Sequence, residues 1–182
     1  MTKSTTIYTI GHSNIPASKL IDLLKQHEIR VVVDVRSSPY SKFSTQFNRE
    51  SIEQSLKLAG IDYKYAGEHL GGRPTDPSCY KNNQIPDGKA DFLQLVDYPK
   101  MMTKDGFKKG IQRLLQISEQ NQTAVMCSEA DPAQCHRHHL IGKFLLQHGI
   151  DVLHIRGDGN IVKAQQIPDL NNEPPVEQLE MF

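Results

Sequence analysis

The chain has 182 residues, and its 21 lysines and arginines balance its 21 aspartates and glutamates. This length suits one domain with a substantial core and is too short for two full domains. A hydrophobic share of 37% and a charged share of 23% exclude a disordered chain, and no apolar run approaches the roughly 20 residues of a membrane span. Three cysteines are too few, and odd in number, for a disulfide framework, so we expect a cytoplasmic protein without a membrane partner.

The charge is unevenly distributed between the body of the sequence and its last residues. Residues 171–182 contain three glutamates and no basic residue, so they carry −3 and the preceding 170 residues carry +3. We expect one α/β domain over residues 1–167 and a flexible acidic tail over 168–182. A body of +3 is compatible with nucleic-acid binding, which the neutral total alone disfavours.

Predicted strands and helices alternate along the chain. This order predicts a Rossmann-like three-layer α/β domain, with a mostly parallel sheet flanked by helices. The stretch 67–88 is rich in glycine and proline and predicts a long loop, which compact domains usually keep for function. The elements in chain order are a strand at 7–12, a helix at 16–27, a strand at 31–35, a helix at 49–59, a strand at 63–66, helices at 89–95 and 103–119, a strand at 123–127, a helix at 131–148 that begins with the Asp131 cap, a strand at 151–155 and a hairpin strand at 161–164.

Polar and reactive side chains lie where three of the predicted strands end. In open α/β sheets, ligands bind beyond the carboxyl ends of the strands. We therefore expect one edge of the sheet to gather an imidazole, two carboxylates, a guanidinium and a thiol. These groups belong to His12, with Ser13 beside it, and to Asp34, Glu129, Arg36 and Cys127.

Several sequence blocks resemble those of a known family. They are Ile10-Gly-His-Ser13, Asp34-Val-Arg36, Leu70-Gly-Gly-Arg73, and Met126-Cys-Ser-Glu129 through Cys135-His-Arg137. In this order, between residue 7 and about residue 156, they look like the signature blocks of domain-of-unknown-function family 488. The resemblance implies a Rossmann-like α/β domain with a shared site, and it implies no particular reaction.

Cys127 offers the first candidate chemistry. A cysteine at a strand end that faces a helix N-terminus can have a lowered thiol pKa. The block at 34–36 is similar to the opening of rhodanese-like domains, which use a strand-end cysteine for sulfur transfer. However, Glu129 and Asp131 would repel a thiolate or persulfide, and the compact anion-cradling loop of those domains is lacking. The alternative is that Cys127 is a small buried residue.

A divalent metal is the second candidate chemistry. Cys127, Cys135 and His136 offer soft and borderline ligands, but the seven residues between the cysteines are not the spacing of a zinc ribbon or finger. In the alternative, Cys135 packs inward while His138 and His139 lie on the solvent face of the helix. We favour this alternative, and the sequence alone assigns no cofactor.

Acid–base chemistry on a phosphate-bearing substrate is the third candidate. Arginine can clamp phosphate in a bidentate fashion, and a nearby carboxylate and imidazole can move protons. The alternatives are an Asp34–Arg36–Glu129 ion-pair network that ties strand ends together and, for the glycines of the 70–73 block, a simple turn. We expect catalysis by His12, Asp34, Glu129 and Cys127, and substrate contacts from Ser13, Arg36, Gly71, Gly72, Arg73 and Arg137.

Residues 178–182 form a motif of a different kind. Gln178-Leu-Glu-Met-Phe182 resembles the peptide with which bacterial replication and repair proteins bind the sliding clamp. Leu179 and the pair Met181 and Phe182 would fill an apolar pocket on the clamp, while Gln178 makes polar contacts. The alternative is that these apolar side chains pack back on the domain.

These features lead to one functional hypothesis and two alternatives. We expect an enzyme, either a hydrolase or a transferase, that acts on a nucleotide or nucleic acid in DNA maintenance and docks on the sliding clamp. The first alternative is a cysteine-dependent sulfur-transfer or redox enzyme. The second is a non-catalytic adaptor tethered to the clamp, in which the polar residues serve structure.

Overall fold

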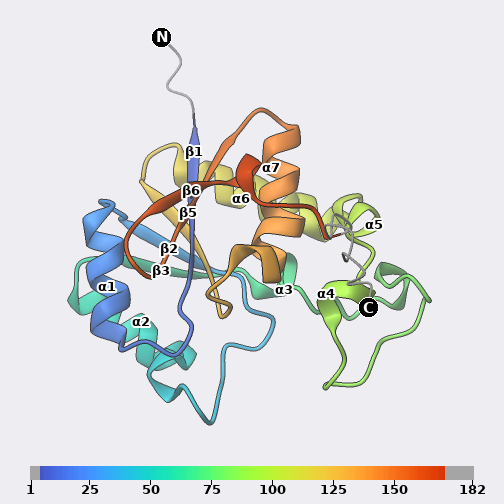
Figure 1. Ribbon diagram of the computed structural model, residues 1–182, viewed down its shortest axis with the longest axis horizontal. Helices are drawn as coiled ribbons and strands as arrows, with labels where there is room; N and C mark the ends of the chain where they lie inside the picture. The colour runs from blue at the N-terminus through green and yellow to red at the C-terminus, as the bar shows by residue number, and fades with distance from the viewer. Residues whose placement is uncertain (1–4, 171–182) are drawn as a thin grey trace, which may run out of the picture.

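The computed structural model describes residues 5–170, which form one sheet covered by helices on both faces (Figure 1). The strand order is β3-β2-β4-β1-β5-β6, and every neighbouring pair except β5 and β6 is parallel. The predicted three-layer α/β fold is therefore confirmed. The strands are β1 (Thr6–Gly11), β2 (Val31–Asp34), β3 (Asp62–Tyr65), β4 (Thr123–Cys127), β5 (Asp151–Ile155) and β6 (Ile161–Lys163).

The central strands β2 and β4 are buried at every position, because helices cover both faces of the sheet. Alternate side chains point to opposite faces, so Val32 packs in one core while Val31 and Val33 pack in the other. The core that contains Val32, here called the first core, lies under α1 (Ala17–Gln26) and α2 (Arg49–Leu58). The core that contains Val31 and Val33, the second core, lies under α6 (Asp105–Ser118).

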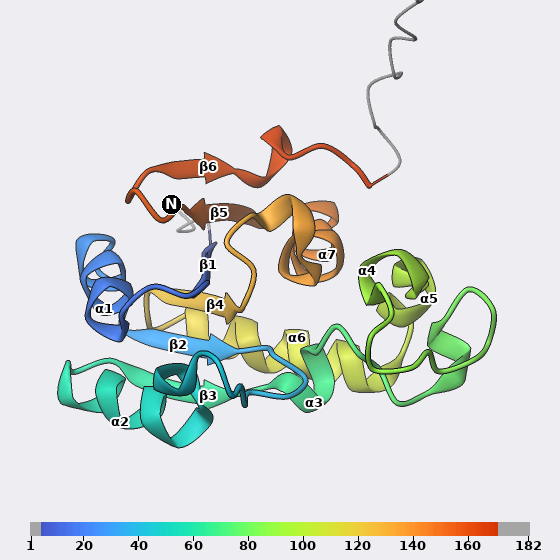
Figure 2. The same cartoon turned by 60° about the horizontal axis from the view of Figure 1, so that its bottom comes forward.

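The segment after β3 is more ordered than the predicted loop at 67–88. It contains α3 (Gly67–Leu70) and a 3-10 turn at Pro77–Cys79. The helix predicted at 89–95 begins only at α4 (Phe92–Leu95), where the Asp91 side chain caps it, and α5 (Tyr98–Met102) was not predicted. The arrowheads of β2, β3 and β4 point toward this segment, which therefore lies beyond the carboxyl ends of these strands (Figure 2).

The prediction of one continuous helix at 131–148 is wrong, because the segment forms three separate elements. Asp131 does act as a cap, but only for a 3-10 turn at Pro132–Gln134, after which Cys135 has extended backbone with φ −142°. A π-helical turn, η4 (Arg137–Gly142), then leads into α7 (Lys143–Gln147). The extended residue breaks the helix, and π-helical turns of this kind are frequent at functional sites.

His138 and His139 lie in the π-helical turn and are buried, with 1% and 2% of their surface exposed. The prediction that they face solvent is therefore wrong. The reason is that His138 Nδ1 lies 3.1 Å from Nε2 of His154 on β5, so this side of the turn faces the sheet. The companion prediction, that Cys135 packs inward, is confirmed by its 1% exposure.

The end of the described chain packs against the domain beyond residue 167. Asp169 forms an ion pair with Lys143, and Leu170 packs against the second core. The remainder of the predicted tail, including the motif at 178–182, lies outside the described residues. Within residues 5–170, no helix combines the length and apolar character needed to cross a bilayer.

Two leucines on α2 provide a test of this packing. Leu56 is fully buried, whereas Leu58 is 83% exposed. Leu56→Ala should lower the free energy of unfolding by about 2–5 kcal/mol, because it leaves a cavity in the core. Leu58→Ala, the matched control, should change it by less than about 0.5 kcal/mol. Urea denaturation measures both, and equal losses would contradict the packing of α2.

Candidate functional site

A cavity of about 510 Å³ lies at the carboxyl edge of the sheet. It forms where the loops after β2 and β4 face the segment that contains α4 and α5. Because β4 lies between β1 and β2, the ends of these three strands are neighbours, with Gly11 paired to Cys127 and Asp34 to Met126. The lining residues are Arg36, Ser37, Ser38, Tyr40, Gly72, Arg73, 90–93, Tyr98, 127–129 and 134–136.

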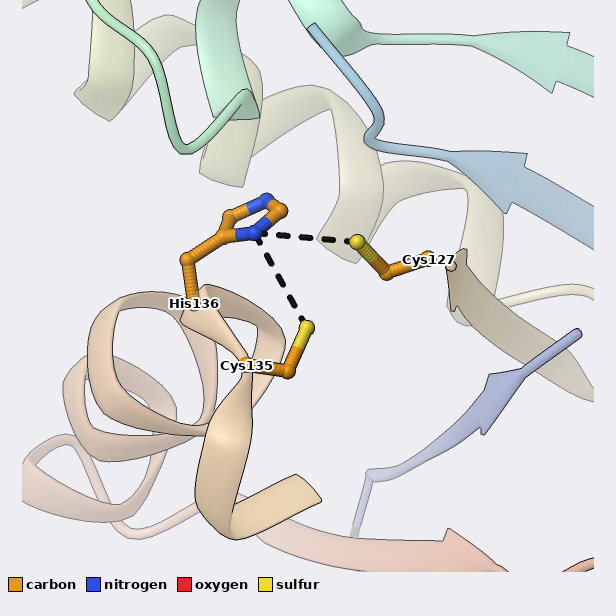
Figure 3. Close-up of side chains that lie close together, drawn as sticks. All are labelled: Cys127, Cys135 and His136. Carbon is orange, nitrogen blue, oxygen red and sulfur yellow. Dashed lines mark hydrogen bonds between the residues drawn. The ribbon is translucent and has the colours of Figure 1, made fainter. Parts of the chain in front are cut away.

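Two thiols, an imidazole and a carboxylate meet at the wall of the cavity. His136 Nδ1 lies 3.7 Å from Cys127 Sγ and 3.9 Å from Cys135 Sγ (Figure 3). Oε2 of Glu129 lies 3.1 Å from both sulfur atoms. The other ring nitrogen of His136 donates to the carbonyl oxygen of Val35 at 3.2 Å, so Nδ1 is the atom that faces the sulfurs.

The pKa values of this cluster move in different directions. The hydrogen bond with Cys135, followed by burial, raises the pKa of the Cys127 thiol well above its usual range. Burial also acts to raise the pKa of Cys135, but hydrogen bonds from Cys127 and His136 outweigh it and bring that thiol pKa well below its usual range. The lowered thiol pKa therefore belongs to Cys135 and not, as predicted, to Cys127. Burial raises the pKa of the Glu129 carboxyl.

Arg137 positions this cluster from behind and does not reach the cavity. Its side chain is fully buried, with Nη1 donating to the carbonyl oxygen of Glu129 at 2.6 Å and Nη2 to that of Ala130 at 3.1 Å. Its Nε donates to Thr9 Oγ1 on β1 at 3.2 Å. These bonds occupy the guanidinium, so the structure assigns Arg137 to the loop after β4 rather than to a substrate phosphate.

Asp34 and Arg36 form a buried pair beside the cavity. The guanidinium contacts both carboxylate oxygens, at 2.6 Å and 2.9 Å, and Tyr63 donates to the same carboxylate at 2.7 Å. Asp34 is 0% exposed and does not line the cavity, whereas Arg36 does. The ion-pair alternative thus describes Asp34 and Arg36, but Glu129 is bonded to the thiols instead.

His12 supports Arg36 and lies outside the cavity lining. Its Nδ1 donates to the carbonyl oxygen of Ser13 at 2.7 Å, so Nε2 accepts from Arg36 Nη1 at 3.1 Å. Burial lowers the pKa of His12 to about 4, so its ring is neutral at neutral pH. Ser13 is exposed, with φ 48°, and its amide donates to the carbonyl oxygen of Ser128. His12 and Ser13 thus connect the loop after β1 with the segments that follow β2 and β4.

The predicted block at 70–73 reaches the site through Gly72 and Arg73. The Arg73 guanidinium lies 4.5 Å from the centre of the Phe92 ring, at the cavity wall. A Cβ on Gly72 would lie 2.7 Å from the ring of His136, and one on Gly71 would lie 2.3 Å from Ser37 Oγ. Both glycines therefore allow close packing, which a simple turn would not require.

A family model described as "Domain of unknown function DUF488" matches residues 16–144. The chain belongs to the DUF488 family. The matched region includes β2, the 70–73 block, β4 and the cluster of Cys127, Cys135 and His136, while His12 and Ser13 precede it. No curated protein and no solved structure matches the chain.

Several residues that line the cavity were not predicted from the sequence. Ser37 and Ser38 directly follow Arg36, so their position after a strand end was a usable indication. Phe92 and Tyr98 come from the segment beyond the strands, and only its packing brings them to the cavity.

Behind the site, buried neutral side chains form a chain of hydrogen bonds. Thr9 Oγ1 accepts from Arg137 and lies 2.7 Å from His154 Nδ1, while His154 Nε2 lies 3.1 Å from His138 Nδ1. Burial lowers the pKa of His138 to about 4 and that of His154 to about 3.

This network predicts that acid destabilises the fold. The folded-state pKa values lie below the unfolded value of 6.5, so the unfolded chain binds more protons as the pH falls below 6.5. The free energy of unfolding should fall from pH 7 to pH 5, by up to about 2 kcal/mol per histidine. His138→Gln should reduce this dependence, and His148→Asn at an exposed position should not. Urea denaturation at both pH values measures it, and equal stability would contradict the prediction.

Proposed function

We propose that the cavity is the active site of a hydrolase or transferase that acts on a phosphate-bearing substrate, a nucleotide or nucleic acid, in DNA maintenance. The observation that carries the proposal is the position of Glu129, a carboxyl with a raised pKa, in a cavity that two arginines also line. Perturbed carboxyls in clefts are typical of acid–base catalysis.

In this proposal Glu129 alone has the acid–base role that the sequence analysis gave to His12, Asp34 and Glu129 together. Its burial favours the protonated form, so its pKa moves toward neutral pH, where a general acid or base is most effective. Asp34 is enclosed by Arg36 and Tyr63, and His12 is neutral and hydrogen-bonded on both ring nitrogens. Of His12, Asp34 and Glu129, only Glu129 lines the cavity.

The anion would be held by Arg73 and by Arg36. The charge of Arg36 is largely offset by its pair with Asp34, so Arg73 supplies most of the attraction. Ser37, Ser38 and Ser128 also line the cavity, and serine hydroxyls can donate to phosphate oxygens. A volume of about 510 Å³ falls within the usual range for small-ligand sites, about 300–1,000 Å³.

A cysteine-dependent sulfur-transfer or redox reaction is the second candidate. The proximity of the two thiols at the cavity wall favours it, with Cys135 as the reactive sulfur because its pKa is lowered. In that case, Cys135→Ser should abolish turnover and Cys135 should be alkylated faster than Cys127. The adaptor alternative instead requires that no substrate be turned over.

Substitution of Glu129 tests the leading proposal. In a screen of nucleotides, phosphate monoesters and single-stranded DNA, Glu129→Gln should lower kcat roughly 100-fold or more, because it removes the proton-transferring group. Glu53→Gln, at an exposed position on α2, is the matched control and should leave kcat unchanged. Full activity of Glu129→Gln, or no turnover of any of these substrates by the wild type, would reject the proposal.

Docking on the sliding clamp is the part of the proposal that rests on the sequence of residues 178–182. The full chain should bind purified bacterial clamp in a titration, and Gln178→Ala combined with Phe182→Ala should abolish binding, because the anchor groups are lost. Glu173→Ala, outside the motif, should leave binding unchanged. Absence of binding at high micromolar concentration would remove the clamp from the proposal.

A further inference from the structure

We propose that Cys127, Cys135 and His136 form a site for a divalent metal of the zinc type, with its fourth coordination position facing the cavity. One ligand atom from each residue lies within 4.8 Å of the other two. All three residues are buried, and all three line the cavity. The site does not depend on the reaction proposed above.

The distances from the imidazole nitrogen to the two sulfur atoms fit tetrahedral coordination. Zinc bonds of about 2.3 Å to sulfur and about 2.0–2.1 Å to nitrogen place the two kinds of ligand about 3.6 Å apart. The distances from His136 Nδ1 to the sulfurs of Cys127 and Cys135 are 3.7 Å and 3.9 Å. The two nitrogen–sulfur distances therefore need to shorten by only a few tenths of an ångström, and the two sulfur atoms, which lie within 4.8 Å of each other, would move closer together around a bound ion.

Hydrogen bonds from neighbouring groups orient His136 and Cys135. His136 donates from Nε2 to the carbonyl oxygen of Val35, which orients Nδ1 toward the sulfurs. The backbone amide of Arg137 donates to Cys135 Sγ at 3.3 Å, as it would to a metal-bound thiolate. Gly72 leaves room for the imidazole of His136, which a side chain at position 72 would displace.

The donor set selects the metal. Two thiolates and an imidazole favour zinc over magnesium or calcium, which prefer oxygen ligands. On binding, the metal replaces the thiol protons, which pass to solvent, so affinity should fall as the pH falls. Glu129 contacts both sulfur atoms, so its carboxyl group would lie beside a bound ion.

Three protein ligands with an open position are typical of catalytic rather than structural zinc, whose sites are closed by a fourth ligand. The seven residues between the cysteines exceed the two to four of a zinc finger, and they carry the chain from a strand end to the start of a helical turn. Cys127 ends β4, whereas Cys135 and His136 lie where the 3-10 turn meets η4.

Metal content tests the site directly. The full chain, freed of any histidine tag, should retain about one zinc per chain after gel filtration, as measured by plasma mass spectrometry. Cobalt should give a thiolate-to-metal charge-transfer band in the near ultraviolet and the intense visible bands of tetrahedral coordination. Cys127→Ser and Cys135→Ser should each weaken binding by more than about 100-fold and reduce the charge-transfer band.

Cys79→Ser is the matched control, because Cys79 is also buried and free but lies outside the cluster. It should keep one zinc and the full cobalt spectrum. If a cluster variant does not fold, the wild-type spectrum decides. A folded wild type that takes up neither metal, or a Cys79→Ser variant that loses the metal as the cluster variants do, would overturn the inference. A zinc-binding but inactive protein would reject only the proposed function, and an active protein that binds no metal would reject only the metal site.

Discussion

The site depends on the hydrogen bonds of one buried group, the guanidinium of Arg137. It joins the loop after β4 to β1, by bonding the carbonyl oxygens of Glu129 and Ala130 and the hydroxyl of Thr9. Burying a charge is costly unless hydrogen bonds satisfy it, so this loop has little freedom to adopt another path. Gly11 permits the approach, because a Cβ there would lie 1.6 Å from the Glu129 carbonyl oxygen.

The position of the reactive groups follows from this anchor. The same chain segment that supplies Arg137 supplies Cys135 and His136 immediately before it, and Glu129 lies in the loop that Arg137 bonds. Fixing one residue therefore places the thiol, the imidazole and the carboxylate together. The backbone is extended at Cys135, where the helical path is interrupted, and the sulfur of this residue lies within 4.8 Å of that of Cys127.

A second group of buried polar side chains, around Asp34 and Arg36, lies at the end of the neighbouring strand β2. Asp34 holds Arg36 in a bidentate contact, and His12 holds the same guanidinium from the other side. These polar groups satisfy one another away from solvent, so burial alone does not distinguish them from catalytic groups. Glu129, the proposed acid–base group, differs because it lines the cavity and contacts two thiols.

The sequence by itself determined the layered α/β fold and the edge at which the polar groups meet. Alternating strand and helix patterns are local, and parallel strands bring their carboxyl ends to one side. Only the tertiary structure decided which groups face the cavity. The contact of His138 with His154 and the bond from Arg137 to Thr9 join distant segments. Cys127, Cys135 and His136 lie within ten residues of one another, and the folded path of the chain between them brings their ligand atoms together. No spacing along the chain encodes those contacts, because the break at Cys135 interrupts the helical periodicity from which positions would be inferred.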